Sequence, residues 1–150
     1  SINDMKSLIL AVLLLVTGLS QAADDKLYKQ HGDYKIFFSA FNSSFIAPDI
    51  AVANNIVRGK DKGLVNIALV KELGVGVTGK VTGTVSNILQ QTQVLEFVPV
   101  LEQNTVYYLA PFEFDNEDFL TFKIQVLPPS GDGPRLYPYD FKFQKKMYVD

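Results

Sequence analysis

The residues that most suggest a specific chemistry are the glycines and the lysine of GVGVTGKVTGT, residues 74–84. Gly74, Gly76 and Gly79 have the spacing of a dinucleotide-binding motif, and Lys80 follows them as in a phosphate-binding loop. A phosphate loop must lead into a helix, because the free N–H groups of the helix N-terminus bind the anion. Here β-branched residues follow and alternate with a period of two, which predicts a strand. We therefore expect no nucleotide and no other cofactor.

Nucleophilic catalysis would have to use His31, which is the only histidine and lies two residues before Asp33. No serine of the chain lies in a G-x-S-x-G segment, so a Ser–His–acid triad lacks its usual nucleophile. The chain has no cysteine, which excludes a thiol nucleophile. One histidine without cysteine also cannot supply the usual zinc ligands. We expect His31 to be an exposed residue just before the first strand, and the protein not to be an enzyme.

An acidic turn at residues 113–118 (EFDNED) has oxygen ligands that calcium prefers. It lacks the glycine and the ligand spacing of an EF-hand loop. A solvated hairpin turn is the favoured interpretation, and calcium binding is the alternative.

The elements that must position these residues are strands, because apolar and polar residues alternate along most of the chain. Turn residues such as Asn87 and Asn104 separate the alternating runs. Pro99 indicates an end or a bulge in a less regular run. The expected strands cover residues 34–41, 65–70, 74–86, 93–101, 106–114, 120–126 and 137–144.

About seven such strands predict an all-β fold, an antiparallel β-sandwich of immunoglobulin-like type. The alternative is an up-and-down barrel with a lipocalin-like ligand cavity. Phe37, Phe41 and Tyr107 alternate with the expected core residues, so they must lie under a loop or helix or in a partner's interface. We expect cover from within the chain.

One segment, residues 45–55, departs from the strand pattern and carries helical signals. Pro48 and Asp49 suit a first helical turn, and Asn54 suits its end. We expect one short helix that crosses from one sheet to the other, followed by a basic turn at residues 58–63.

The candidate interaction residues lie around this segment: Asn42, Arg58 and Asn66. Arg58 has a planar group suited to a carboxylate or to backbone carbonyls. Asn66 lies in an apolar strand, where a buried amide needs hydrogen-bond partners. In one interpretation the two asparagines pin the helical segment to the sheets and Arg58 pairs with a surface acid. In the other, these residues contact a partner.

The segments FNSSFIAPDIA (residues 41–51) and GLVNIAL (residues 63–69), separated by a short basic loop, resemble the uncharacterised exported bacterial family DUF4426. The resemblance extends over nearly the whole mature chain. It implies an exported single domain with no assigned activity, so no catalytic or binding residue is transferred from it. Arg58 matches the family pattern, whereas Gly59 occupies a position where a serine is expected.

The first residues predict export. Met5 and Lys6 begin a short positive region, residues 8–16 are apolar, and residues 20–22 place small residues at a signal-peptidase site. The apolar run is shorter than the roughly 20 residues that a membrane-spanning helix needs. We expect residues 1–4 to be a cloning remnant, residues 5–22 to be a signal peptide cleaved after Ala22, and residues 23–150 to be one periplasmic domain that is not inserted in the membrane.

The charge of the chain argues against nucleic acid as a partner, because the formal net charge is −2. The lysines at positions 142, 145 and 146 are interpreted as a solvated strand edge, where lysines discourage strand pairing.

Three functions remain open from the sequence. The favoured one is a non-catalytic exported domain that binds a protein or peptide through a strand edge or an aromatic patch. The second is a small-ligand or glycan binder of sandwich or barrel type. The third is a carboxylate-based hydrolase.

Overall fold

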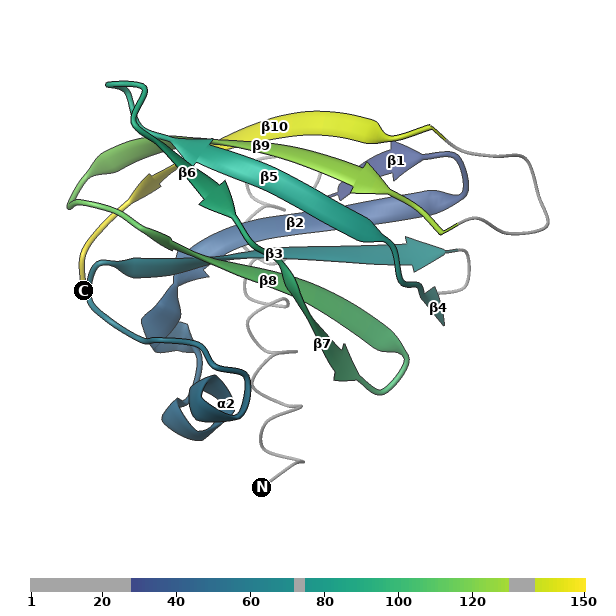
Figure 1. Ribbon diagram of the computed structural model, residues 1–150, viewed down its shortest axis with the longest axis horizontal. Helices are drawn as coiled ribbons and strands as arrows, with labels where there is room; N and C mark the ends of the chain where they lie inside the picture. Colours follow the sequence, from purple (N-terminus) through teal and green to yellow (C-terminus); the bar gives the residue numbers. More distant parts are fainter. Residues whose placement is uncertain (1–27, 72–74, 130–136) are drawn as a thin grey trace, which may run out of the picture.

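The computed structural model describes residues 28–71, 75–129 and 137–150, which form two antiparallel sheets packed face to face (Figure 1). Sheet A has the order β1–β2–β3–β8–β7, with β4 paired to the end of β3, and sheet B has the order β10–β9–β5–β6. Sheet A contains β1 (Tyr28–His31), β2 (Tyr34–Asn42), β3 (Lys62–Lys71), β4 (Val75–Gly76), β7 (Val98–Glu102) and β8 (Thr105–Glu113). Sheet B contains β5 (Lys80–Ser86), β6 (Thr92–Leu95), β9 (Asp118–Leu127) and β10 (Tyr139–Met147).

The predicted all-β sandwich is therefore confirmed. The described strands form two separate sheets, so the alternative of a single closed sheet is wrong. The expected signal peptide at residues 5–22, the cleavage site after Ala22 and the remnant at residues 1–4 lie outside the described residues.

The main core lies between the two sheets and follows from the period of two along each strand. In β9, for example, Phe122, Ile124 and Val126 are buried, whereas Lys123 and Gln125 between them face solvent. The same alternation places the inner residues of β2, β3, β5 and β8 in this core. The fully buried side chains here include Ile36, Val65, Ile67, Leu69, Val85, Leu120, Phe122, Val126 and Met147.

A second apolar cluster lies on the outer face of sheet A, where the short helix α2 (Pro48–Ala53) covers it (Figure 1). Pro48 begins the helix and Asn54 ends it, as predicted. The predicted path is wrong, however, because β2 and β3 on either side of α2 are neighbours in sheet A, and the helix does not cross to sheet B. Phe41 and Tyr107 are buried in this cluster, which confirms cover from within the chain for both rings.

The glycine-rich segment is two strands instead of one, because the chain changes sheets at residues 77–79. β4 pairs with β3 of sheet A, and β5 pairs with β9 of sheet B. Tyr108 of sheet A holds this passage: Gly79 N donates to its hydroxyl at 2.8 Å, and the hydroxyl donates to Gly79 O at 3.1 Å. Val81 and Val85 are buried as expected, and Gly74 lies outside the described residues.

The expected single strand at residues 93–101 is also wrong. β6 pairs with β5 in sheet B, whereas β7 pairs with β8 in sheet A, so the chain passes from one sheet to the other at Glu96 and Phe97. Residues 92–102 thus run along one side of the sandwich as the edge strand of both sheets in turn (Figure 1). Phe97 packs against the main core at the point of passage.

The acidic turn at residues 113–118 is a third place where the chain passes from one sheet to the other. It joins β8 of sheet A to β9 of sheet B, so it is a connection between sheets and not the expected hairpin turn.

Candidate interaction surface

Asn42 and Arg58 meet around Ser44, at the start of the segment that carries α2. Asn42 Nδ2 donates to the carbonyl of Tyr148 at 2.8 Å and to a carboxylate oxygen of Asp150 at 2.9 Å. The Ser44 hydroxyl donates to the same carboxylate, and Arg58 Nη2 donates to the carbonyl of Ser44 at 3.3 Å. Asn42 therefore holds residues 148–150, and Arg58 binds a backbone carbonyl instead of the expected surface acid.

Asn66 lies apart from these two residues, in the middle of sheet A. It is paired across the strands with Ser39, and both side chains face outward into the second apolar cluster, where they are buried. Asn66 Oδ1 and Ser39 Oγ have no hydrogen-bond partner among the described residues. Asn66 therefore does not pin the helical segment through this oxygen. The same cluster buries the Tyr107 ring, and this burial raises the pKa of its hydroxyl.

The side of the sandwich formed by β6 and β7 exposes large aliphatic side chains. Val94 of β6 and Leu101 of β7 are 72% and 77% exposed, and Val98 is also exposed. Ile88 and Leu89 add two more, at the turn between β5 and β6. These five residues lie within residues 88–101 along one side of the sandwich, which we call the β6–β7 side. Val94 is on the outer face of sheet B, opposite Thr84, and Val98 is on the outer face of sheet A, opposite Leu109.

The turn between β5 and β6 is held firmly, although its tip is apolar. The side-chain oxygen of Asn87 accepts hydrogen bonds from the backbone N–H groups of Leu89 and Gln91, both at 3.0 Å. The amide of Asn87 donates to the side chain of Gln91 at 2.6 Å. The tip therefore presents Ile88 and Leu89 on a fixed backbone, beyond the ends of the sheets (Figure 1).

The strand edges on this side differ. β6 ends sheet B and β7 ends sheet A, and no further strand of the described residues covers either. Pro99 lies opposite Tyr108 in the ladder, and because it lacks an N–H group it interrupts the free edge of β7. The edge of β6 has no proline and is the better template for an added strand.

The opposite side of the sandwich, between β2 and β10, is closed by contacts within the chain. The ring of Phe38 lies 5.4 Å from that of Phe141 and 4.8 Å from that of Phe143. The ammonium group of Lys145 donates to the carbonyl of Ala40, and burial there lowers its pKa although the residue as a whole is exposed.

His31 takes part in this closure. Its Nε2 lies 2.7 Å from the carbonyl of Tyr137, and its ring lies 4.9 Å from that of Tyr139. It is the last residue of β1 and half-buried, so the expectation of an exposed residue before the first strand is wrong.

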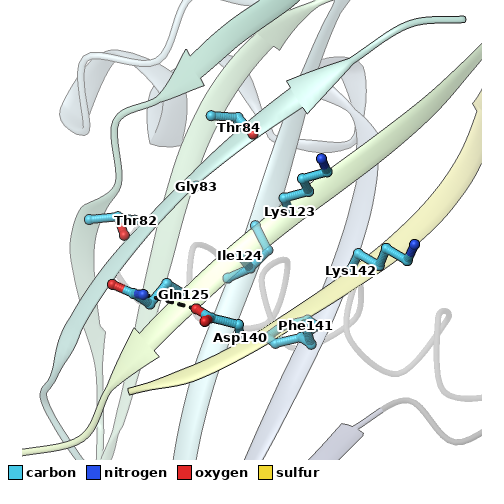
Figure 2. Close-up of a pocket in the computed structure, with 9 residues that line it drawn as sticks. All are labelled: Thr82, Gly83, Thr84, Lys123, Ile124, Gln125, Asp140, Phe141 and Lys142. Atoms are coloured by element: carbon cyan, nitrogen blue, oxygen red, sulfur yellow. Dashed lines mark hydrogen bonds between the residues drawn. The ribbon is translucent and has the colours of Figure 1, made fainter. Parts of the chain in front are cut away.

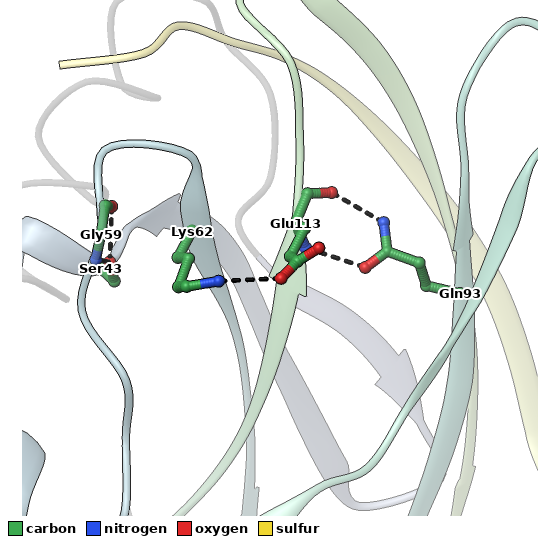
Figure 3. A network of polar contacts seen from close by, with 5 residues as sticks. All are labelled: Ser43, Gly59, Lys62, Gln93 and Glu113. Atoms are coloured by element: carbon green, nitrogen blue, oxygen red, sulfur yellow. Dashed lines mark hydrogen bonds and ion pairs between the residues drawn. The ribbon is translucent and has the colours of Figure 1, made fainter.

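A polar pocket of about 240 Å³ lies at one end of the sandwich, between the β5–β6 turn and the acidic turn. Figure 3 shows the contacts at its rim: Lys62 Nζ lies 2.8 Å from Glu113 Oε1, and Gln93 exchanges two hydrogen bonds with the backbone of Glu113. The hydrogen bond to Glu113 raises the pKa of Lys62. Asp118 accepts from the backbone N–H of Asp115 at 2.8 Å. Within the described ranges, no three carboxylate or imidazole side chains are placed to hold a metal ion.

A larger and shallower groove, of about 490 Å³, lies on the outer face of sheet B (Figure 2). Its floor is the backbone of the cross-strand row of Gly83, Ile124 and Phe141, because the side chains of Ile124 and Phe141 point into the main core. The rows on either side form its two walls: Thr82, Gln125 and Asp140 on one, and Thr84, Lys123 and Lys142 on the other.

Sequence reasoning missed both the β6–β7 side and this groove. The exposed aliphatic residues at positions 88, 89, 94 and 101 were visible in the sequence, but only the change of sheet shows that they share one side. Likewise, Lys123 and Lys142 are 19 positions apart, and only the register of β9 and β10 places them opposite each other.

None of the described helices has the length and apolar character needed to span a bilayer.

Comparison with known proteins supports the family assignment. The family model "Domain of unknown function (DUF4426)" matches residues 28–150. A crystal structure of a DUF4426 family protein from Pseudomonas aeruginosa PAO1 is similar at 30% identity and a TM-score of 0.70, over 82% of this chain and 94% of that chain. FetP of uropathogenic Escherichia coli strain F11 is similar in fold, with 11% identity and a TM-score of 0.60, over 81% of this chain and 93% of that chain. No curated protein matches this chain.

Proposed function

This chain belongs to the DUF4426 family, a domain of unknown function, and we propose that it is an exported, non-catalytic domain that binds a protein or peptide partner through the β6–β7 side. The observation that supports this proposal is the row of exposed aliphatic side chains along two free strand edges.

The physical argument rests on the contrast between the two sides of the sandwich. Aromatic rings and the Lys145 hydrogen bond close the side between β2 and β10. On the β6–β7 side, Val94 and Leu101 are 72% and 77% exposed. Exposed apolar side chains beside unpaired strand edges are typical of a protein–protein contact. Burying one such side chain at an interface stabilises the complex by about 1.5–3 kcal/mol.

The edge of β6 favours an extended partner segment. Because Pro99 interrupts the edge of β7, main-chain pairing is expected along β6, and side-chain contacts are expected at Leu101 and at the β5–β6 turn. Asn87 fixes that turn before binding, so little conformational entropy is lost when Ile88 and Leu89 are covered.

The two alternative functions have less support. A lipocalin-like binder needs an enclosed apolar cavity, whereas the larger of the two depressions described above is an open groove with polar walls. A hydrolase needs two free carboxyl groups that face one substrate. Of the four carboxylates that line the polar pocket, Glu113 is paired with Lys62 and Asp118 accepts from the backbone N–H of Asp115, so this alternative would have to use Asp61 and Asp115.

Export to the periplasm is part of the proposal. It is supported by the signal-like segment at residues 5–22. The domain also builds its core without a disulfide, because the chain has no cysteine, so its folding does not depend on oxidation after export. FetP, the distant structural relative, was expressed recombinantly in the periplasm of E. coli. The protein purified from the periplasm is expected to begin at residue 23, which N-terminal sequencing measures.

The test of the binding surface is a pull-down from periplasmic extract with matched surface variants. The protein with Val94→Thr and Leu101→Thr is expected to lose its partner, because two exposed apolar contacts are removed. The control is Val52→Thr on α2, which changes an equally exposed valine at another place.

Captured proteins are identified by mass spectrometry, and the melting temperatures of the variants show that each is folded. A partner that is lost from the double variant and kept by Val52→Thr supports the proposal. A partner that both variants retain equally would place the contact elsewhere on the molecule.

A further inference from the structure

The groove on sheet B contains a pair of like charges that the fold does not explain. Lys123 of β9 and Lys142 of β10 are directly opposite each other and point outward from the same face. Like charges in this position repel and destabilise a strand pair. Neither ammonium group has an ion pair or hydrogen bond to a described residue.

The interpretation of lysines as edge protection accounts for only one of the two. β10 is an edge strand of sheet B, so Lys142 can discourage pairing with another chain. Lys123 lies on β9, which has β10 on one side and β5 on the other, and needs no such protection. A counterion from outside the chain would remove the repulsion between the two lysines.

The groove has the size and the polar groups for such a ligand. Its volume of about 490 Å³ lies within the range of small-molecule sites. Thr84 adds a hydroxyl group to the wall that carries the two lysines (Figure 2). From this geometry we propose that the groove binds a small oxyanion, a carboxylate or a phosphate, between Lys123 and Lys142.

The opposite wall restricts the ligand further. Asp140 accepts a hydrogen bond from Gln125 Nε2 at 2.9 Å, and its carboxylate gives this wall a negative charge. The two walls are two residues apart along each strand, about 7 Å. A polyanion that filled the groove would meet the Asp140 carboxylate. The site therefore suits a small ligand with one anionic end and hydroxyl or amino groups at the other.

The lysines lie on β9 and β10, whereas the proposed partner surface lies on β6, β7 and the β5–β6 turn. The two surfaces adjoin at Thr84, which is opposite Lys123 on one side and Val94 on the other, so the groove is tested on the purified protein without a partner. The full exported protein is titrated with inorganic phosphate and, separately, with gluconate, at constant ionic strength set with sodium chloride. Backbone amide chemical shifts are followed by NMR. Saturable shifts are expected at residues 84, 123 and 142, with phosphate alone, with gluconate alone or with both, according to the source of the oxyanion.

Matched variants separate a site from a general charge effect. Lys123→Gln is expected to raise the dissociation constant by about tenfold or more, because a charge-assisted hydrogen bond is lost. Lys80→Gln removes an exposed charge of β5 outside the groove and is expected to change it by less than about twofold. The proposal is overturned if neither anion gives saturable shifts, or if Lys80→Gln weakens binding as much as Lys123→Gln.

Discussion

At the scale of single residues, two buried serines of the same segment have opposite surroundings. The Ser43 hydroxyl donates to Gly59 O at 3.1 Å and accepts from Gly59 N at 3.0 Å, so it ties the loop after α2 to the end of β2 (Figure 3). The Ser39 hydroxyl, buried beside Asn66, has no such partner. A buried polar group contributes stability only when it is paired, so the two serines should respond differently to the same substitution.

We predict that Ser43→Ala lowers the free energy of unfolding by about 1–3 kcal/mol, because Gly59 N–H and C=O lose their partner. Ser39→Ala should leave it unchanged within about 0.5 kcal/mol or raise it, because an unpaired hydroxyl is removed from an apolar cluster. Urea unfolding of the two variants and the parent protein measures both changes in the free energy of unfolding. A loss for Ser39→Ala as large as that for Ser43→Ala would show that Ser39 and Asn66 stabilise the fold.

At the scale of elements, the pairing of β3 with β8 depends on a glycine beneath an aromatic ring. Gly63 is opposite Phe112, and a Cβ atom added at Gly63 would lie 2.3 Å from the ring. Phe112 cannot move freely, since it is buried and its ring lies 5.2 Å from that of Phe122. The two strands can keep this register only if position 63 has no side chain.

Gly63→Ala is therefore expected to cost about 1–3 kcal/mol of stability through overpacking. The matched control is Gly59→Ala, whose Cβ would meet the flexible side chains of Lys62, at 3.2 Å, and Asp61, at 3.4 Å. Its effect should be small. Thermal unfolding of the two variants measures the difference, and equal melting temperatures would contradict this account of the β3–β8 pair.

The elements themselves could be predicted where the local pattern was complete. β9 alternates along nearly its whole length and β10 over its first six residues, and Pro48 and Asn54 mark the ends of α2. The change of sheet at residues 77–79 was invisible, because Val77 and Val81 face the same core on both sides of it. Alternation reports which face of a strand is buried and not which strand is its neighbour.

Two further features were not predicted, for different reasons. The β1–β2 hairpin had a signal that was missed, the dipeptide Gly32–Asp33, where Gly32 has a φ of 58°. The path of α2 had no local signal at all, because only the pairing of Asn42 with Gly63 shows that β2 and β3 lie in one sheet.

At the scale of the whole molecule, the candidate surfaces follow from pairing between distant segments. Asn42, Arg58 and Asn66 could be selected from the sequence by residue type, yet the structure places Asn66 in the middle of sheet A, away from the other two. The exposed residues of the β6–β7 side and the two lysines of the groove come together only through the order of strands in the sheets. Long-range register, which residue types do not encode, decides both.

The central claim, that the β6–β7 side contacts a partner, is tested most directly by site-specific photocrosslinking in intact cells. A benzophenone amino acid is placed at position 94 on β6 and, as a control, at position 52 on α2, both exposed valines. The account predicts a discrete protein adduct after irradiation at position 94 and none at position 52. Adducts at position 52 alone, or none at position 94 in cells that contain the exported protein, would contradict it.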